Sequence, residues 1–249
     1  MGLVPWAAIA LIGALVGFLG GLFGKGGSAI ATPLLAAVGV PPIVAVASPL
    51  PATIPGTLVA FWRYREVGVF DRDVIRWSIV VGVPATGAGA VLTRWVGGGA
   101  LVRVTDVLII VIGARVLLWS DREESTPVEV PRRLARIVIT AVVVGFLAGF
   151  LANAGGFLLV PLYLAVVRLP IKTALSCSLA VASVLAVPGT IVHAALGHID
   201  WSVTLVFGAA SIPLSSLGAR TALQMNSTRL ERVFGAGLLI LGIVFLFLR

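Results

Sequence analysis

Charged residues are scarce in this sequence. Asp, Glu, Lys and Arg make up 11% of the 249 residues, against about 25% in an ordinary soluble domain. Hydrophobic residues make up 59%, and the mean hydropathy is +1.12. This balance excludes a soluble domain and predicts an all-α polytopic membrane protein. The net charge of +8 comes from arginines in short loops between apolar segments, where they orient a membrane protein rather than bind nucleic acid.

The sequence has a single cysteine and none of the common catalytic motifs. Cys177 is the sole cysteine, so the chain forms no intrachain disulfide, and its apolar surroundings predict a buried, inert thiol. The sequence has no HExxH or GxSxG motif, no Cys/His cluster and no intramembrane pair of carboxylates. We therefore expect neither an enzyme, nor a metal centre, nor a bound cofactor.

An internal repeat organises what the chain does contain. Shifting the sequence by 128 or 129 residues aligns glycines and prolines in the same order in both parts, as with Gly68 and Gly197. Such matches between breaker residues rarely arise by chance. We predict two homologous transmembrane repeats at 1–119 and 132–249, joined by a polar cytoplasmic linker at 120–131.

Each half contains five apolar segments. They lie at 5–23, 27–38, 43–62, 73–93 and 101–119 in the first half, and at 135–152, 154–167, 172–196, 202–219 and 230–248 in the second. The second segment of each half is shorter than the ~20 residues that span the membrane, so it is either a short spanning helix or a re-entrant hairpin. The third segment of the first half holds Pro49, Pro51 and Pro55, and we expect it to be broken rather than continuous.

The distribution of positive charge favours inverted halves. If both short segments cross the membrane, the halves are inverted, and every lysine and arginine except Arg94, Arg103 and Arg249 lies on the cytoplasmic side. If the short segments are re-entrant, the halves are parallel and the positive charges are distributed almost evenly. The positive-inside rule therefore predicts inverted repeats of five segments each.

Glycine-rich breaks precede both short segments and form the first candidate site. A break in a membrane helix frees backbone N–H groups, and the helix that follows points its positive dipole end at an anion. A lysine in the first break adds a full charge, and an asparagine supplies amide donors at the equivalent position. The alternative is that the glycines only permit close packing and the lysine snorkels to the cytoplasmic surface. The candidate residues are Gly24, Lys25, Gly26, Gly27, Asn153, Gly155 and Gly156.

Hydroxyl groups in the third segments form the second candidate. Ser48 and Ser176 occupy equivalent positions in the two halves, where each could hydrogen-bond an oxyanion near the midplane. The alternative is that such hydroxyls satisfy backbone groups at a kink, which is our expectation for Ser178 and Ser183.

Ionisable residues within the apolar segments are few. Asp106 and His193 are candidates for proton coupling, because ionisable groups inside a membrane usually serve function. Asp71 and Asp200 come directly before new segments, and we predict that both are helix N-caps.

The doubled glycine motif resembles a known family. The stretches GLFGKGGSAIATPLL and GFLANAGGFLLVPLYL are similar to those of the sulfite exporter TauE/SafE family of bacterial membrane transporters. The resemblance implies a multi-pass plasma-membrane protein that exports sulfite or a related sulfur-containing or organic anion by alternating access between its halves. It places the family's glycine motif on Gly24, Gly26, Gly27, Gly155 and Gly156. The family usually has glycine where Lys25, Asn153 and Ala154 stand here.

Two other functions remain open on the sequence alone. The first is an anion channel with the same site as its filter, and the second is a non-transporting membrane scaffold. The expected partners are a small anionic substrate and the lipid bilayer, with a homodimer left open.

Overall fold

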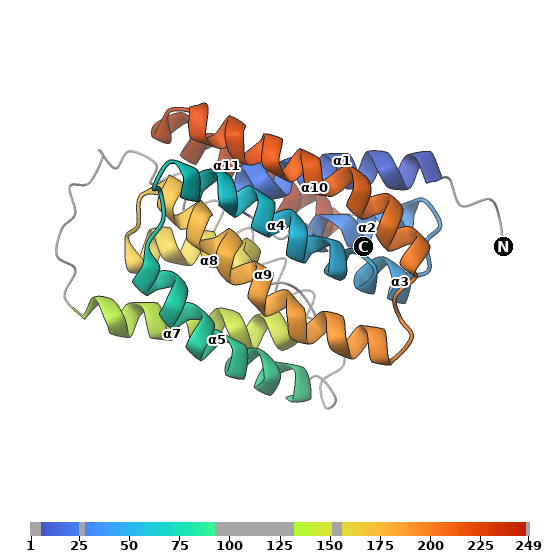
Figure 1. The fold of residues 1–249 in the computed structure, drawn as a ribbon, viewed down its shortest axis with the longest axis horizontal. Coiled ribbons are helices and arrows are strands. Elements are labelled where there is room, and N and C mark those ends of the chain that lie inside the picture. The colour runs from blue at the N-terminus through green and yellow to red at the C-terminus, as the bar shows by residue number, and fades with distance from the viewer. Residues whose placement is uncertain (1–5, 25–27, 93–131, 151–155, 248–249) are drawn as a thin grey trace.

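The computed structural model describes residues 6–24, 28–92, 132–150 and 156–247 (Figure 1). These residues form helices and no strand, which confirms the all-α class. The helices are α1 (Trp6–Phe23), α2 (Ser28–Ala37), α3 (Pro42–Ala47), α4 (Pro49–Glu66), α5 (Arg72–Leu92), α7 (Arg133–Phe150), α8 (Gly156–Leu162), the π-helical η2 (Tyr163–Val167), α9 (Ile171–Ala195), α10 (Trp201–Gln224) and α11 (Ser227–Phe247).

The positions of the apolar segments in the sequence predicted the positions of the helices well. Each expected segment within the described residues is helical, with ends shifted by a few residues, and the segments at 43–62 and 154–167 comprise two helices each. Segment 101–119 and linker 120–131 lie outside the described residues. Within the described part of the chain, four spans are long and apolar enough to cross a membrane. They are Trp6–Phe23, Pro42–Glu66, Ile171–Ala195 and Trp201–Gln224.

The proline-rich third segment is less broken than expected. The chain is interrupted at Ser48, between α3 and α4, but α4 then continues to Glu66. Pro49 and Pro51 fall in the first turn of α4, where backbone N–H groups have no partner within the helix. Only Pro55 lies in the helix interior, so the expectation that no continuous helix could hold these prolines was wrong.

Close backbone packing joins the two halves. Gly13, Gly17 and Gly21 follow one another at four-residue intervals on α1, and all three face the backbone of α10. A Cβ built on Gly17 would lie 2.2 Å from the Ser211 carbonyl oxygen, so only glycine permits this approach. The equivalent pair in α7 and α5 is as close, because a Cβ on Gly145 would lie 2.5 Å from the Gly82 carbonyl oxygen. In each case the first apolar segment of one predicted half packs against the fourth apolar segment of the other.

Helix directions follow from contacts at both ends of α9. Near its end, Gly189 faces Leu50, which lies in the first turn of α4. Near its beginning, the Cys177 thiol lies 3.7 Å from the carbonyl oxygen of Asp71, which follows α4 in the chain. Helices α4 and α9 are therefore antiparallel, as their colours in Figure 1 show.

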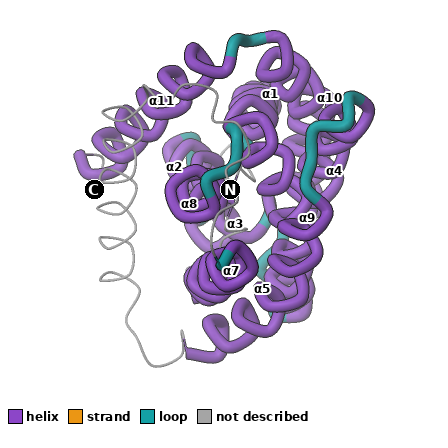
Figure 2. The backbone as a smooth tube through the Cα atoms, turned by 90° about the vertical axis from the view of Figure 1, so that its left-hand side faces the viewer, coloured by secondary structure: helices purple, strands orange, loops and turns teal. Residues whose placement is uncertain are grey.

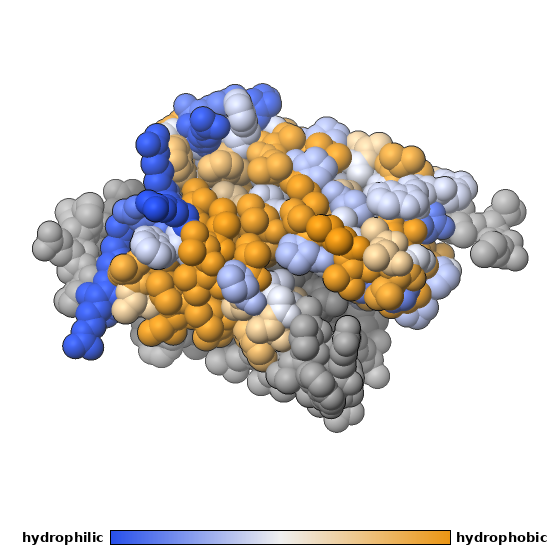
Figure 3. Space-filling model, turned by 60° about the horizontal axis from the view of Figure 1, so that its bottom comes forward, coloured by the Kyte–Doolittle hydropathy of each residue, from blue (hydrophilic) through white to orange (hydrophobic). Residues whose placement is uncertain are grey.

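The molecule consequently has two distinct ends. At one end, which we call the basic end, α4 and α10 finish and α5, α7, α9 and α11 begin. At the other, which we call the histidine end, α9 finishes and α4 and α10 begin. The basic end carries all the described arginines and lysines, namely Arg63, Arg65, Arg72, Arg76, Arg132, Arg133, Arg136, Arg168, Lys172, Arg220, Arg229 and Arg232. Hydrophilic residues gather at one end of the face in Figure 3, and hydrophobic residues cover much of the rest.

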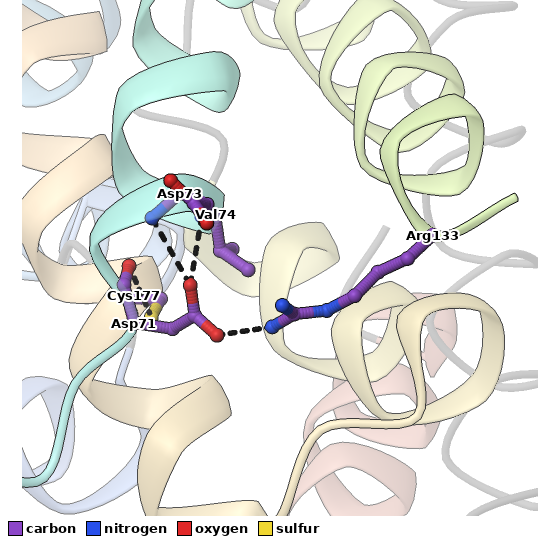
Figure 4. A network of polar contacts seen from close by, with 5 residues as sticks. All are labelled: Asp71, Asp73, Val74, Arg133 and Cys177. Atoms are coloured by element: carbon purple, nitrogen blue, oxygen red, sulfur yellow. Dashed lines mark hydrogen bonds and ion pairs between the residues drawn. The ribbon is translucent and has the colours of Figure 1, made fainter. Parts of the chain in front are cut away.

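Both predicted N-caps are confirmed. The Asp71 carboxylate accepts hydrogen bonds from the backbone N–H groups of Asp73 and Val74 at 3.1 Å. The Asp200 carboxylate accepts two equivalent bonds at the start of α10. Asp71 also pairs with Arg133 at the start of α7, so one side chain caps a helix and joins the halves (Figure 4).

Candidate functional site

A single hydroxyl connects the two glycine-rich breaks. The Ser178 hydroxyl on α9 lies 2.8 Å from the carbonyl oxygen of Gly24, just after α1, and 3.2 Å from that of Gly156, the first residue of α8. Ser178 is fully buried. Since a serine hydroxyl carries one hydrogen, the two carbonyls share it. Segments that are far apart in the sequence thus meet at one atom, seven residues into α9.

Gly24 requires glycine for two reasons. Its φ of +65° belongs to the left-handed region, and a Cβ there would lie 2.9 Å from the Cα of Leu175 and 3.0 Å from a methyl group of Val160. This tight packing agrees with the alternative interpretation of the breaks, in which the glycines only permit helices to pack closely against one another. The same geometry holds the ends of both breaks beside α9, so for Gly24 and Gly156 packing and site formation go together.

The short helices lead away from Ser178 in opposite directions. The end of α2 and the turn that follows it pack through Leu35 and Val40 into a cluster with Val203, which lies at the histidine end. The π-helical end of the second short segment lies at the basic end, where Arg136 donates a hydrogen bond to the Val166 carbonyl oxygen. Viewed along the long helices, α2 and α8 lie one behind the other, surrounded by longer helices (Figure 2). Both short helices therefore begin in the interior.

A narrow cavity lies beside the first break, between α1, α4, α9 and α10. Glycines form its wall on the α1 side, and Leu179, next to Ser178 in the chain, contributes from α9. Its polar lining consists of hydroxyl groups from helices of both halves: Thr53, Thr57, Ser211 and Ser215. An uncharged, hydroxyl-lined cavity halfway along membrane helices can hold water or a small polar solute.

The cavity hydroxyls differ in how firmly their hydrogens are held. Thr57 donates to the Thr53 carbonyl oxygen at 2.8 Å, and Ser215 donates to that of Gly17 at 3.1 Å. The Ser211 hydroxyl lies 3.5 Å from the Gly208 carbonyl oxygen, which is a weak hydrogen bond. Ser211 is consequently the cavity hydroxyl that can most easily turn its hydrogen toward an anion.

The two candidate serines of the third segments have different environments. Ser48 is fully buried at the histidine end, where its hydroxyl accepts a hydrogen bond from the Asp200 N–H and its carbonyl oxygen accepts one from Thr204. Ser176 is also fully buried, and its hydroxyl has no hydrogen-bond partner among the described residues. They lie toward opposite ends of α9 and do not form a common site.

The remaining candidates are placed as follows. His193 lies in the last turn of α9 at the histidine end, beside His198, and away from Ser178. Six candidates lie outside the described residues: Lys25, Gly26, Gly27, Asp106, Asn153 and Gly155.

Sequence reasoning underrated Ser178 and did not single out His198. The hydroxyl of Ser178 does bond to backbone, as expected, but to the backbone of the two breaks rather than of its own helix. Only the tertiary contact reveals this. His198 had a readable signal, because Gly197 just before it predicts a helix end that folds residues on either side together.

Comparisons with known proteins identify similar membrane proteins. The family model described as sulfite exporter TauE/SafE matches residues 9–245. A probable membrane transporter protein of Xylella fastidiosa is 28% identical over 90% of this chain and 88% of its own length. Similarly named proteins of Methanocaldococcus jannaschii and Bacillus subtilis are 23% and 22% identical, covering 96% and 95% of this chain and 94% and 98% of their own lengths. No solved structure matches the chain significantly.

Proposed function

The chain belongs to the sulfite exporter TauE/SafE family, and we propose that it exports a small anion from the bacterial cytoplasm by alternating access. It is a multi-pass membrane protein, and its relatives are named as probable membrane transporters. The observation that carries the proposal is the meeting of both glycine-rich breaks at Ser178. This junction brings together segments of both halves in the interior, where a transporter of this kind binds its substrate.

Inverted repeats are part of the proposal. The antiparallel course of α4 and α9, which are equivalent helices of the two halves, supports inversion. The gathering of the described arginines and lysines at the basic end supports a cytoplasmic location for that end. Two inverted halves of similar structure can rock against each other and expose a shared site to either side in turn.

An anionic substrate is supported by the groups available near the junction. We propose that Lys25, with the backbone at Gly26, Gly27 and Gly155, supplies positive potential, and that Asn153 supplies amide donors. The Ser176 hydroxyl has no hydrogen-bond partner among the described residues, and the Ser211 hydroxyl makes only a weak bond, so both can donate to an anion. Export also agrees with energetics, because an anion leaving a cell that is negative inside gains ~2.3 kcal/mol per charge per 100 mV.

A transport assay tests the function. Purified protein in vesicles should release at least one of sulfite, thiosulfate, a sulfonate or a carboxylate in a saturable manner. Protein-free vesicles measure leakage. Flux that rises linearly with concentration would indicate a channel instead, and no flux of any of the four anions would favour a scaffold.

The lysine provides the sharpest test of the site. We expect Lys25→Ala to weaken the affinity for the transported anion at least tenfold, about 1.4 kcal/mol, because a full charge is removed from a low-dielectric site. Folding should be intact, as judged by thermal unfolding of the purified variant. An unchanged affinity would return Lys25 to a snorkelling role.

Topology can be tested at matched positions. Val67 and Leu196 are exposed residues in equivalent turns, after α4 and after α9. In a background with the buried Cys177 replaced by serine, we expect Val67→Cys and Leu196→Cys to react with an impermeant thiol reagent from opposite sides of the membrane. Labelling from the same side would refute the inverted arrangement without affecting the transport result.

A further inference from the structure

The turn that ends α9 brings two histidines together at the histidine end of the molecule. Helix α9 finishes at Ala195, and Gly197 adopts the left-handed conformation with φ +70°. The Gly197 N–H donates to the Ala194 carbonyl oxygen at 3.1 Å, and the His198 N–H donates to that of His193 at 3.0 Å. This pair of bonds defines a Schellman motif, in which the residues at the positions of His193 and His198 face each other.

The same turn in the first half carries different side chains. Gly68 has φ +72°, its N–H donates to the Arg65 carbonyl oxygen, and the Val69 N–H donates to that of Tyr64. Tyr64 and Val69 therefore stand where His193 and His198 stand in the second half. Largely apolar side chains at these positions are the usual choice, since they make the hydrophobic contact of the motif. The second half replaces that contact with two imidazoles.

The two imidazoles have the spacing of a metal chelate. Their Nδ1 atoms are 3.2 Å apart, and the ring centroids are 5.4 Å apart. A tetrahedral zinc ion with Zn–N distances of about 2.0–2.1 Å separates two of its nitrogen ligands by about 3.3–3.4 Å. Both histidines are partly exposed, so an ion can reach them from the aqueous side.

We propose that His193 and His198 bind a borderline divalent cation such as Zn²⁺ through their Nδ1 atoms, at the end of the protein opposite the described arginines and lysines. In the metal-free protein the Nδ1–H of one ring donates to the Nδ1 of the other. In the bound form both rings carry their hydrogen on Nε2, and the metal takes the place of the shared hydrogen. Water completes the coordination, because no third His, Cys, Asp or Glu joins the pair among the described residues.

Binding should make the α9–α10 turn more stable. The metal would join the last turn of α9 to the residue that leads into α10, and a ligand that binds only the folded state raises its melting temperature. Imidazole ligands favour zinc, copper and nickel, whereas magnesium prefers oxygen ligands. The site should thus discriminate between Zn²⁺ and Mg²⁺.

The test uses the full chain, purified in detergent without a polyhistidine tag. Calorimetric titration with ZnCl₂ should show one ion per chain, and Zn²⁺ but not Mg²⁺ should raise the melting temperature. His198→Val and His193→Tyr place the first-half side chains in the second-half turn, so both variants should fold. Each should weaken Zn²⁺ binding at least tenfold and abolish the rise in melting temperature.

Two results would overturn the proposal. The first is a wild-type protein that binds no Zn²⁺ up to about 1 mM. The second is a His198→Val variant that binds Zn²⁺ with wild-type affinity, which would place the metal elsewhere. Neither result depends on transport activity, so this test is independent of the proposed export function.

Discussion

Several backbone features of this protein recur 128 or 129 residues apart, while the side chains placed on them differ. The left-handed glycine after α4 recurs after α9, the N-cap of α5 recurs at α10, and the close approach of α1 to α10 recurs between α7 and α5. Ser178, however, corresponds to Leu50 in the first half, so only one half supplies the hydroxyl that joins the breaks. Packing and helix ends thus recur, while the hydroxyl that joins the two breaks is present in the second half alone. Substitutions at equivalent positions can therefore measure how much the recurring features and the unshared contact each contribute to stability.

The largest effect is expected where helices touch backbone to backbone. Gly17→Ala and Gly145→Ala each place a methyl group within 2.5 Å of a carbonyl oxygen of the facing helix, so the helix pair must move apart. We expect each to destabilise the protein by about 1–3 kcal/mol, with similar values in both halves. Thermal unfolding in detergent measures the change.

Gly87 provides the matched control for this pair. It lies within α5 and is exposed, and a Cβ added there would have nothing within 4 Å, so Gly87→Ala should gain about 1 kcal/mol of helix propensity. A Gly17 variant that is destabilised while the Gly145 variant is not would show that the two interfaces are not equivalent.

The second effect compares two serines of α9. Ser178→Ala removes the donor to the carbonyl oxygens of Gly24 and Gly156, and a lost buried hydrogen bond costs about 1–3 kcal/mol. Ser176→Ala removes a buried hydroxyl that has no partner among the described residues, so its stability should be unchanged or slightly higher. Unfolding temperatures and substrate affinity should be measured together for both variants. If Ser176 contacts the anion, Ser176→Ala lowers affinity without lowering stability. Equal unfolding temperatures for Ser178→Ala and Ser176→Ala would contradict the expected difference in hydrogen bonding.

These contrasts also mark what the sequence can and cannot predict. Helix positions follow from apolar length, and the caps at Asp71 and Asp200 from local spacing, because both depend on neighbouring residues. The continuity of α4 was misjudged because the effect of a proline depends on its place in the helix, and Pro51 falls in the first turn. The junction at Ser178 joins residues more than 150 positions apart, and no local pattern encodes such a contact.

The third effect concerns the two caps. Asp71→Ala and Asp200→Ala each remove the side-chain acceptor for two backbone N–H groups, which costs about 0.5–2 kcal/mol. Asp71→Ala should be the more damaging, since it also removes the ion pair with Arg133 of the other half. Chemical denaturation of both variants checks the order, and Asp71→Asn serves as the control because asparagine is as good an N-cap. Equal losses for both alanine variants would mean that the ion pair contributes nothing.

The smallest effect belongs to that ion pair alone. Arg133→Gln leaves the cap of α5 intact and removes only the charge partner of Asp71, with side chains that are 44% and 21% exposed. Solvent screens such a pair, so we expect a loss of stability of less than about 1 kcal/mol at low ionic strength.

The matched control is Glu66→Gln, which breaks the pair between Arg63 and Glu66 within α4 and should cost about 0.3 kcal/mol. Both differences should shrink toward zero at about 1 M salt, where the screening length falls to about 3 Å. A loss of stability for Arg133→Gln that persists at high salt would mean that Arg133 contributes through packing rather than charge. The contact between α5 and α7 at the basic end would then depend on van der Waals packing.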